Sequence, residues 1–143
     1  MNKKIIYIAL SVIIILIASV IGYYYFVINT SKLTVSTQTG AVKVNNITKN
    51  PVETFSNYDV EFKKTGDYYL DYYAKDKLFV ITLVNPDIQT ARNKAEQDFL
   101  STLQISQAQA CQLNVQLGVP YSVNADKAGL NFGLSFCPNG KPF

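Results

Sequence analysis

The sequence predicts an α+β fold, with an N-terminal transmembrane helix followed by a mainly antiparallel β domain. We expect one long amphipathic helix on the sheet and a C-terminal segment tied by a disulfide. Three patterns lead to this prediction. The run from Ile5 to Ile28 carries no charge. Short segments of alternating apolar and polar residues fill positions 32 to 84. Apolar residues then recur every three or four positions from Ile88 to Leu103.

The N-terminal apolar run has the length of a membrane span, since about 20 apolar residues cross a bilayer as a helix. It ends in the aromatic cluster 23–26, which suits the headgroup boundary. A cleaved signal peptide has an apolar stretch of roughly 7–15 residues and a small-x-small cleavage site. This run is longer and no such site follows it. We therefore expect an uncleaved anchor at 5–28, rather than a cleaved signal or a buried core helix.

The charges beside this run predict its orientation. Lys3 and Lys4 precede it, and the first residues after it carry only Lys32. Positive charge tends to stay in the cytoplasm. We expect residues 1–4 to form a cytoplasmic tip, residues 5–28 to lie in lipid, and the rest of this single-pass chain to face the extracytoplasmic side of the cell membrane.

The remaining residues provide enough chain for one modest core. We divide them into a β-rich region, 29–84, and a helix-helix-strand-strand region, 85–143. The formal charge is +3 overall, and two of the lysines belong to the tip, so we expect no nucleic-acid partner. The chain has no histidine, which excludes Ser-His-Asp and Cys-His catalysis and nearly all zinc chemistry. We expect no metal and no cofactor.

The chain has two cysteines, Cys111 and Cys137. In an oxidising compartment a small domain usually bridges such a pair. A reactive thiol is the alternative, but the pair lacks Cys-x-x-Cys spacing and a histidine partner. We therefore expect a disulfide between them.

Alternation and turn residues predict a hairpin followed by a meander of three strands. The last strand is apolar on both faces, which predicts a central strand covered on both sides. The hairpin is expected at 32–37 and 41–46, and the meander at 57–63, 67–73 and 78–84.

Asn85 and Pro86 predict the start of the long helix, as its N-cap and first helical residue. An apolar stripe predicts the face of this helix that packs on the sheet, with four charged residues mostly off the stripe. The stripe is Ile88, Ala91, Ala95, Phe99 and Leu103, and the charged residues are Arg92, Lys94, Glu96 and Asp98.

Ser106 and Gln109 have the spacing of a capping box, which predicts a second, shorter helix that ends near Cys111. Alternating apolar residues then predict two more strands, one at 113–117 and a last one at 130–134. The disulfide would tie the short helix to the last strand.

Residues 32–84 resemble the PEGA domain, a small β module of surface-associated proteins. Leu33-Thr-Val-Ser-Thr matches its opening strand, Gly40-Ala41 the end of its name-giving tetrapeptide, and Gly66-Asp-Tyr68 a later strand entry. Gln38-Thr39 departs from the Pro-Glu half of that tetrapeptide. The resemblance implies a noncatalytic module displayed at the cell envelope and no particular ligand.

Five tyrosines gather at and near the predicted strand 67–73, and Tyr58, Tyr69 and Tyr73 form our candidate aromatic binding face. An exposed aromatic face binds glycans or peptides, although core and cross-strand positions are the simpler explanation of these tyrosines. Four carboxylates could gather nearby, and paired carboxylates perform glycoside hydrolysis, although solvated surface acids are the simpler interpretation. They are Asp59, Glu61, Asp67 and Asp71.

No catalytic residue is assigned, and we expect a membrane-anchored, extracytoplasmic, noncatalytic interaction module. Its expected partners are membrane lipid through residues 5–28 and an envelope protein or a cell-wall polymer. A pilin-like structural subunit is one alternative, although the early glutamate and the leader glycine of pilins are absent. An envelope enzyme that depends on Asp or Glu is the other.

Overall fold

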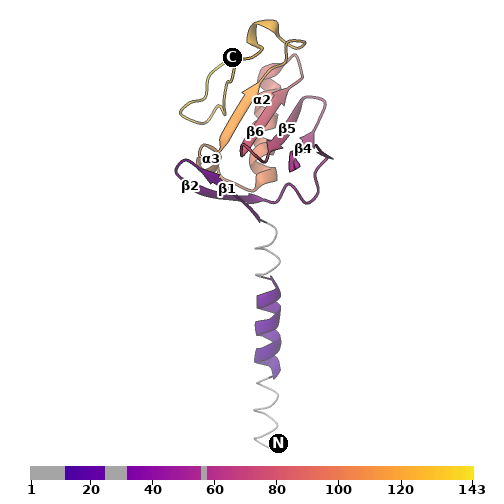
Figure 1. Ribbon diagram of the computed structural model, residues 1–143, viewed down its shortest axis with the longest axis vertical. Coiled ribbons are helices and arrows are strands. Elements are labelled where there is room, and N and C mark those ends of the chain that lie inside the picture. The colour runs from indigo at the N-terminus through magenta and orange to yellow at the C-terminus, as the bar shows by residue number, and fades with distance from the viewer. Residues whose placement is uncertain (1–11, 25–31, 56–57) are drawn as a thin grey trace, which may run out of the picture. The chain divides into compact units, whose positions relative to one another are not determined.

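The computed structural model describes residues 12–24, 32–55 and 58–143 (Figure 1). The chain divides into two compact units, Met1–Lys32 and Leu33–Phe143. The second unit contains both the β-rich region and the helix-containing region that we distinguished in the sequence, so these two regions fold together.

The described part of the first unit is a helix over residues 12–24 with exposed side chains. Ser19 Oγ donates a hydrogen bond to the carbonyl of Ile15 at 2.8 Å. Within residues 12–24, 32–55 and 58–143, no helix combines the length and apolar character that crossing a membrane requires. The tip 1–4 and parts of the predicted span, 5–11 and 25–28, lie outside the described residues. The span therefore stays a prediction.

The second unit contains a two-stranded sheet, β1-β2, and a five-stranded sheet in the order β3-β4-β5-β6-β7. A short helix α3 and a 3₁₀ helix flank β7 in sequence. The elements are β1 Lys32–Thr37, β2 Gly40–Asn45, β3 Glu53–Thr54, β4 Val60–Lys64, β5 Tyr68–Tyr73, β6 Leu78–Leu83, α2 Ile88–Leu103, α3 Gln107–Ala110, β7 Asn114–Gly118 and η2 Ala125–Lys127.

The predicted hairpin and meander are confirmed, because β1-β2 and β4-β5-β6 form where alternation placed them. The short edge strand β3 adds a strand that we did not predict. The larger correction concerns β7, which pairs with β6 in parallel. A parallel neighbour requires a crossover connection, and α2 and α3 supply it. The five-stranded sheet is therefore antiparallel except at this edge.

Helix α2 lies against one face of this sheet, and Figure 1 draws it behind the strands. Phe79, the second residue of β6, is buried and contacts Phe99 of α2, with ring centroids 5.4 Å apart. On the opposite face of β6, Val80 and Thr82 are only half-buried. β6 is thus central, as predicted, but its two faces are not equally covered.

The long helix begins two residues later than its predicted start, because Asp87 rather than Asn85 is the N-cap. Asp87 Oδ1 accepts a hydrogen bond from the backbone N–H of Thr90 at 3.2 Å. The side-chain amide of Asn85 instead donates to Asp67 Oδ1 at 2.6 Å. Asn85 therefore anchors the connection to the start of β5, and the helix begins after it.

Two of the four charged residues that we placed off the apolar stripe are buried. Arg92 is 2% exposed and Glu96 is 5% exposed. Arg92 Nε lies 2.9 Å from Glu96 Oε1, and the guanidinium also donates to the carbonyls of Gly133 and Lys141 at 2.8 Å each. Glu96 in turn accepts hydrogen bonds from the backbone N–H and the hydroxyl of Ser135. The pair thus holds the C-terminal segment against α2.

The same contacts explain why the last predicted strand, 130–134, is wrong. The structure assigns no strand to these residues. Gly133 has φ +60°, outside the extended region, and its carbonyl turns to Arg92. The buried Phe132 and Leu134 still supply the apolar contacts that the alternation anticipated.

The predicted disulfide and capping box are both confirmed. Cys111 and Cys137 are bonded, with their Cα atoms 5.4 Å apart. The Ser106 hydroxyl caps Gln109, and the Gln109 side chain accepts from the backbone of Ser106. Because Cys111 is the C-cap of α3, the bridge joins the end of this helix to the irregular C-terminal segment.

Candidate functional site

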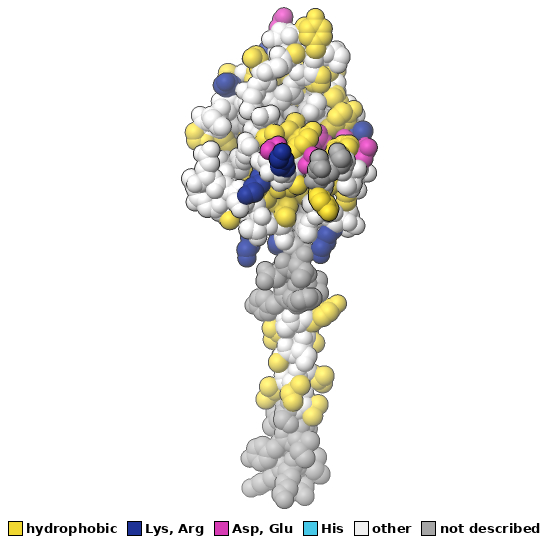
Figure 2. All heavy atoms as spheres, in the orientation of Figure 1, with side chains coloured by type: hydrophobic (Ala, Val, Ile, Leu, Met, Phe, Trp, Pro, Cys, Tyr) yellow, Lys and Arg dark blue, Asp and Glu magenta, His cyan; other side chains and the backbone are white. Residues whose placement is uncertain are grey.

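The candidate site lies on the sheet face opposite α2, which we call the open face. Strand register places side chains of five strands in one row across it. Residues that pair directly across a sheet point to the same side. This row is Glu53, Glu61, Asp71, Val80 and Gln116. In Figure 2, acidic, basic and hydrophobic side chains lie together on the visible face of the domain.

A β-bulge in β4 decides which lysine reaches the open face. Register shifts between Glu61 and Lys63, so Phe62 is the extra residue. Beyond the bulge, Lys63 pairs with Leu70 on the α2 side, where its Nζ lies 3.2 Å from Asp98 of that helix. Lys64 is therefore the lysine that turns to the open face.

Two carboxylates meet on this face. Glu61 and Asp71 are direct cross-strand partners, and Glu61 is only 4% exposed. Lys64 Nζ lies 3.3 Å from Glu61 Oε1 and donates a hydrogen bond to Oε2 at 3.4 Å. Asp71 Oδ1 and Glu61 Oε1 are both buried, and neither has a hydrogen-bond partner among the described residues. Lys64 thus offsets the charge of Glu61 but leaves one oxygen of each carboxylate without a donor.

The environment of Asp71 disfavours its charged form. Burial, and then the repulsion of Glu61, raise the pKa of Asp71 to about 6, while Lys64 opposes the shift. Like charges directly opposite each other destabilise a sheet. A half-buried acid with a shifted pKa is a candidate functional group when it sits with other functional groups in a binding-competent surface.

Two of the three candidate tyrosines flank this acid. Tyr69 and Tyr73 lie two residues before and after Asp71 on β5, so all three side chains share the open face. Lys64 Nζ lies 4.8 Å from the centroid of the Tyr69 ring. Tyr73 is 36% exposed, and burial followed by the charge of Asp71 raises its pKa. We call Glu61, Lys64, Tyr69, Asp71 and Tyr73 the acid–tyrosine cluster.

Tyr58 stands apart from this cluster. It is 83% exposed and has φ +65°, an unusual conformation for a bulky residue. The next residue, Asp59, accepts a hydrogen bond from the backbone N–H of Ala74 at 2.8 Å. This bond holds Tyr58 near the end of β5 at which Tyr73 lies. Among the described rings, however, no contact joins Tyr58 to Tyr69 or Tyr73.

The four candidate acids separate into two roles. Only Glu61 and Asp71 come together. Asp59 holds the turn after β5, as described above, and Asp67 pairs with Lys94 at 2.7 Å. The hydrogen bonds from Lys94 and Asn85 lower the pKa of Asp67, so this acid is a satisfied structural group. In the described part of the chain, no group of three or more Asp, Glu or Cys side chains is arranged to hold a metal ion.

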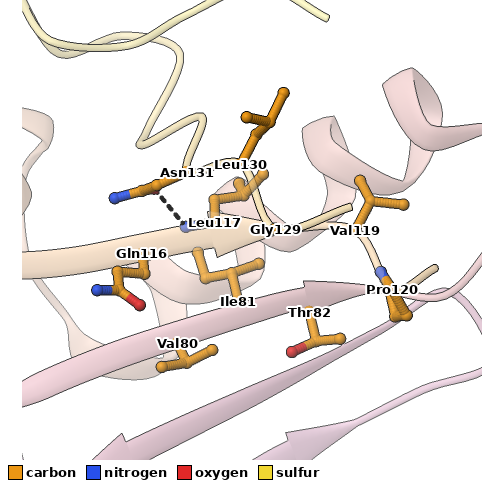
Figure 3. Close-up of a pocket in the computed structure, with 11 residues that line it drawn as sticks. Val80, Ile81, Thr82, Gln116, Leu117, Val119, Pro120, Gly129, Leu130 and Asn131 are labelled. Carbon is orange, nitrogen blue, oxygen red and sulfur yellow. Dashed lines mark hydrogen bonds between the residues drawn. The ribbon is translucent and has the colours of Figure 1, made fainter. Parts of the chain in front are cut away.

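A hollow of about 370 Å³ lies on the open face beside the cluster (Figure 3). Val80, Thr82 and Gln116 project to one side of β6 and β7, whereas Ile81 and Leu117 project to the other and are fully buried. The hollow therefore opens on the side of the cluster. It is lined by Val80, Ile81, Thr82, Gln116, Leu117, Gly118, Val119, Pro120, Gly129, Leu130 and Asn131.

The rim of the hollow also closes the edge of the sheet. The side chain of Asn131 accepts a hydrogen bond from the N–H of Leu117 at 3.0 Å, and the N–H of Phe132 donates to the carbonyl of Leu117 at 2.9 Å. Gly118 has no side chain to fill the space between β7 and this segment. The sequence gives no signal for the hollow, because it depends on the parallel placement of β7.

Comparison of the chain with models of known families, with curated proteins and with solved structures finds no match. The resemblance of residues 32–84 to the PEGA domain therefore stays a prediction.

Proposed function

We propose that this protein is a membrane-anchored, extracytoplasmic, noncatalytic interaction module of the cell envelope, and that the open face is its binding surface. The uncharged run Ile5–Ile28 and the lysines before it support the anchor and its direction. The Cys111–Cys137 bridge supports an oxidising compartment. The PEGA-like features of residues 32–84 fit a displayed module. The partner is an envelope protein or a cell-wall polymer.

One observation carries the binding part of this proposal. Asp71 lies between two tyrosines and directly opposite the buried Glu61, and one of its oxygens has no donor among the described residues. This arrangement costs stability, because two like charges face each other in partly desolvated surroundings. Functional sites commonly keep such locally unfavourable arrangements. A cationic partner would relieve the part of this cost that comes from the repulsion between the two carboxylates.

Site-specific photo-cross-linking tests the binding surface. A photoreactive phenylalanine analogue replaces Tyr73 on the open face or, as the matched control, Tyr121, which is 78% exposed in the loop after β7. In membranes from cells that express the full chain, we expect a discrete cross-linked product from position 73 and none from position 121. Equal products from both positions, or none from either, would contradict the proposal.

Protease protection tests the topology. Protease added to intact cells or spheroplasts should digest residues 33–143, because the proposal places them on the outer side of the membrane. Protection of these residues until the membrane is permeabilised would overturn the extracytoplasmic assignment.

The carboxylate pair also favours a second candidate function, a hydrolase with Asp71 as acid and Glu61 as base. Its support is that two facing carboxylates have different environments, which is how enzymes separate acid and base roles. Turnover of a glycan or peptidoglycan substrate that is lost in both Asp71→Asn and Glu61→Gln, and kept in Asp67→Asn, would favour it over the binding module.

A further inference from the structure

We propose that the open face binds an extended segment of a partner protein that carries a basic side chain two residues from an apolar one. The basic group binds at Asp71, and the apolar side chain enters the part of the hollow at Val80 and Gln116. This inference rests on the proposed function, because it names the chemistry of the partner for the same surface.

The net negative charge of the open face favours a ligand with a positively charged group. The row across the sheet contributes three carboxylates, those of Glu53, Glu61 and Asp71. Lys64 faces the same row and is already engaged with Glu61 and the Tyr69 ring. An ammonium or guanidinium group would offset the remaining negative charge of the row. A neutral group would not offset it, and an acidic ligand would be repelled.

The spacing of the strands determines how far the apolar side chain of the partner lies from its basic group. Val80 and Gln116 follow Asp71 in the row, and neighbouring strands lie about 4.8 Å apart. The hollow at β6 and β7 is therefore roughly 5–10 Å from Asp71 across the face. Alternate side chains of an extended segment are about 6.5–7 Å apart on the same side. A basic and an apolar residue at positions i and i+2 match this separation.

The lining of the hollow suits an apolar side chain. Val80, Pro120 and Leu130 contribute to it, and Leu130 is 55% exposed. Burial of an aliphatic side chain there would remove apolar surface of both partners from water.

Addition of a partner strand at the sheet edge is the competing mode of peptide binding. The structure disfavours it at β7, because Asn131 and Phe132 already bond to the backbone of Leu117 on that edge. At the opposite edge, β3 consists of two residues, Glu53–Thr54, which offers little backbone for pairing. The face rather than an edge is therefore the docking surface.

The test uses the full chain in detergent micelles and fluorescent probe peptides. The probe is acetyl-Gly-Lys-Gly-Leu-Gly-amide, and its matched controls carry Glu in place of Lys or Ser in place of Leu. Fluorescence anisotropy reports affinity, and backbone amide NMR shifts report the location. We expect the probe to bind more tightly than either control and to shift the amides of Asp71, Val80 and Gly118.

Three variants assign the contacts. Asp71→Asn keeps the shape of the side chain, removes its charge, and should weaken probe binding about tenfold, since a charge-assisted hydrogen bond is lost. Asp76→Asn, an exposed acid in the turn after β5, is the control and should leave affinity unchanged. Gly118→Val should weaken the probe with Leu and leave the Ser control peptide unaffected. An added Cβ there lies 3.5 Å from the carbonyl oxygen of Leu130, an ordinary contact, so this variant should fold.

Equal binding of the Lys and Glu peptides, or unchanged affinity in Asp71→Asn, would overturn this inference. If the peptides fail while cross-linking from position 73 persists, the open face still binds a partner, but one of different chemistry such as a glycan. If both experiments fail, the proposed function falls together with the inference.

Discussion

Arg92 Nε and Glu96 Oε1 lie 2.9 Å apart, one turn from each other on α2, and both side chains are buried. The Arg92 guanidinium reaches carbonyls at Gly133 and Lys141, and it also lies 4.9 Å from the centroid of the Phe143 ring. A buried ion pair contributes little net stability over apolar packing, but loss of one partner leaves the other charge uncompensated. This relationship leads to the first prediction.

Arg92→Leu should lower the free energy of unfolding by about 3–5 kcal/mol, because Glu96 would stay buried without its cation. Urea denaturation followed by circular dichroism measures the change. The double variant Arg92→Leu/Glu96→Leu should recover part of the loss. Lys94→Ala, which breaks an exposed ion pair on the same helix, should leave the midpoint unchanged. A single variant as stable as the wild type would show that the C-terminal segment is held by other contacts.

Removal of the disulfide should destabilise the domain by about 3.5 kcal/mol, the loop-entropy value for a separation of 26 residues. Cys111→Ser/Cys137→Ser, compared with the wild type in urea, measures this difference. In the native protein a thiol-reactive label should modify neither cysteine until a reductant is added. Labelling without reductant would contradict the bridge.

Asp71 predicts an unusual pH dependence. Its pKa is raised to about 6 in the fold, so between pH 4 and 6 the folded state binds more protons at this group than the unfolded state. Stability contributed by Asp71 should therefore fall as pH rises through this window. The facing groups Glu53, Glu61, Lys64, Tyr69 and Tyr73 are the charged and titratable neighbours.

The Asp71→Asn variant isolates this effect. It should be more stable than the wild type by about 1–2 kcal/mol at pH 7, since it removes the repulsion by Glu61 and the partial burial of a charge. The difference should shrink toward pH 4. Urea midpoints measured at several pH values test this prediction. A variant less stable than the wild type at neutral pH would contradict burial and repulsion by Glu61 as the causes of the raised pKa of Asp71.

Tyr68 and Asp98 predict the opposite pH dependence. The Tyr68 hydroxyl donates to Asp98 Oδ2, and this bond is the main reason why the pKa of Asp98 is lowered. Its contribution to stability is present above about pH 4 and is lost as pH falls through the lowered pKa. Tyr68→Phe should lower the free energy of unfolding by about 1–2 kcal/mol at neutral pH. Below pH 4 the stability of this variant should depend less steeply on pH than that of the wild type. An unchanged acid transition would contradict this assignment.

Local patterns predicted much of this fold correctly. The alternation of Tyr68, Leu70 and Tyr72 located β5 and its buried face, because period two is a property of the strand itself. The Ser106 capping box located α3 for a similar reason, since both partners lie within four residues. The alternation that places Tyr69, Asp71 and Tyr73 on one face of a strand was also visible in the sequence.

The features that failed depend on partners far away in sequence. The burial of Arg92 and Glu96 depends on backbone groups at Gly133 and Ser135, some 40 residues later. The bulge at Phe62, which sends Lys64 to Glu61, interrupts the alternation from which faces are read. The parallel pairing of β7 is equally invisible in a short apolar segment, and the hollow follows from it.

The order of the strands along the chain has a consequence for biogenesis. β6 is an interior strand of the sheet, but its second neighbour, β7, is supplied by Asn114–Gly118, after both helices. In a nascent chain that emerges N-terminus first, the edge of β6 that later pairs with β7 therefore stays unpaired until these residues arrive. Unpaired strand edges recruit other strands. A pause in synthesis between positions 84 and 114 would thus be the moment at which this protein most needs a chaperone.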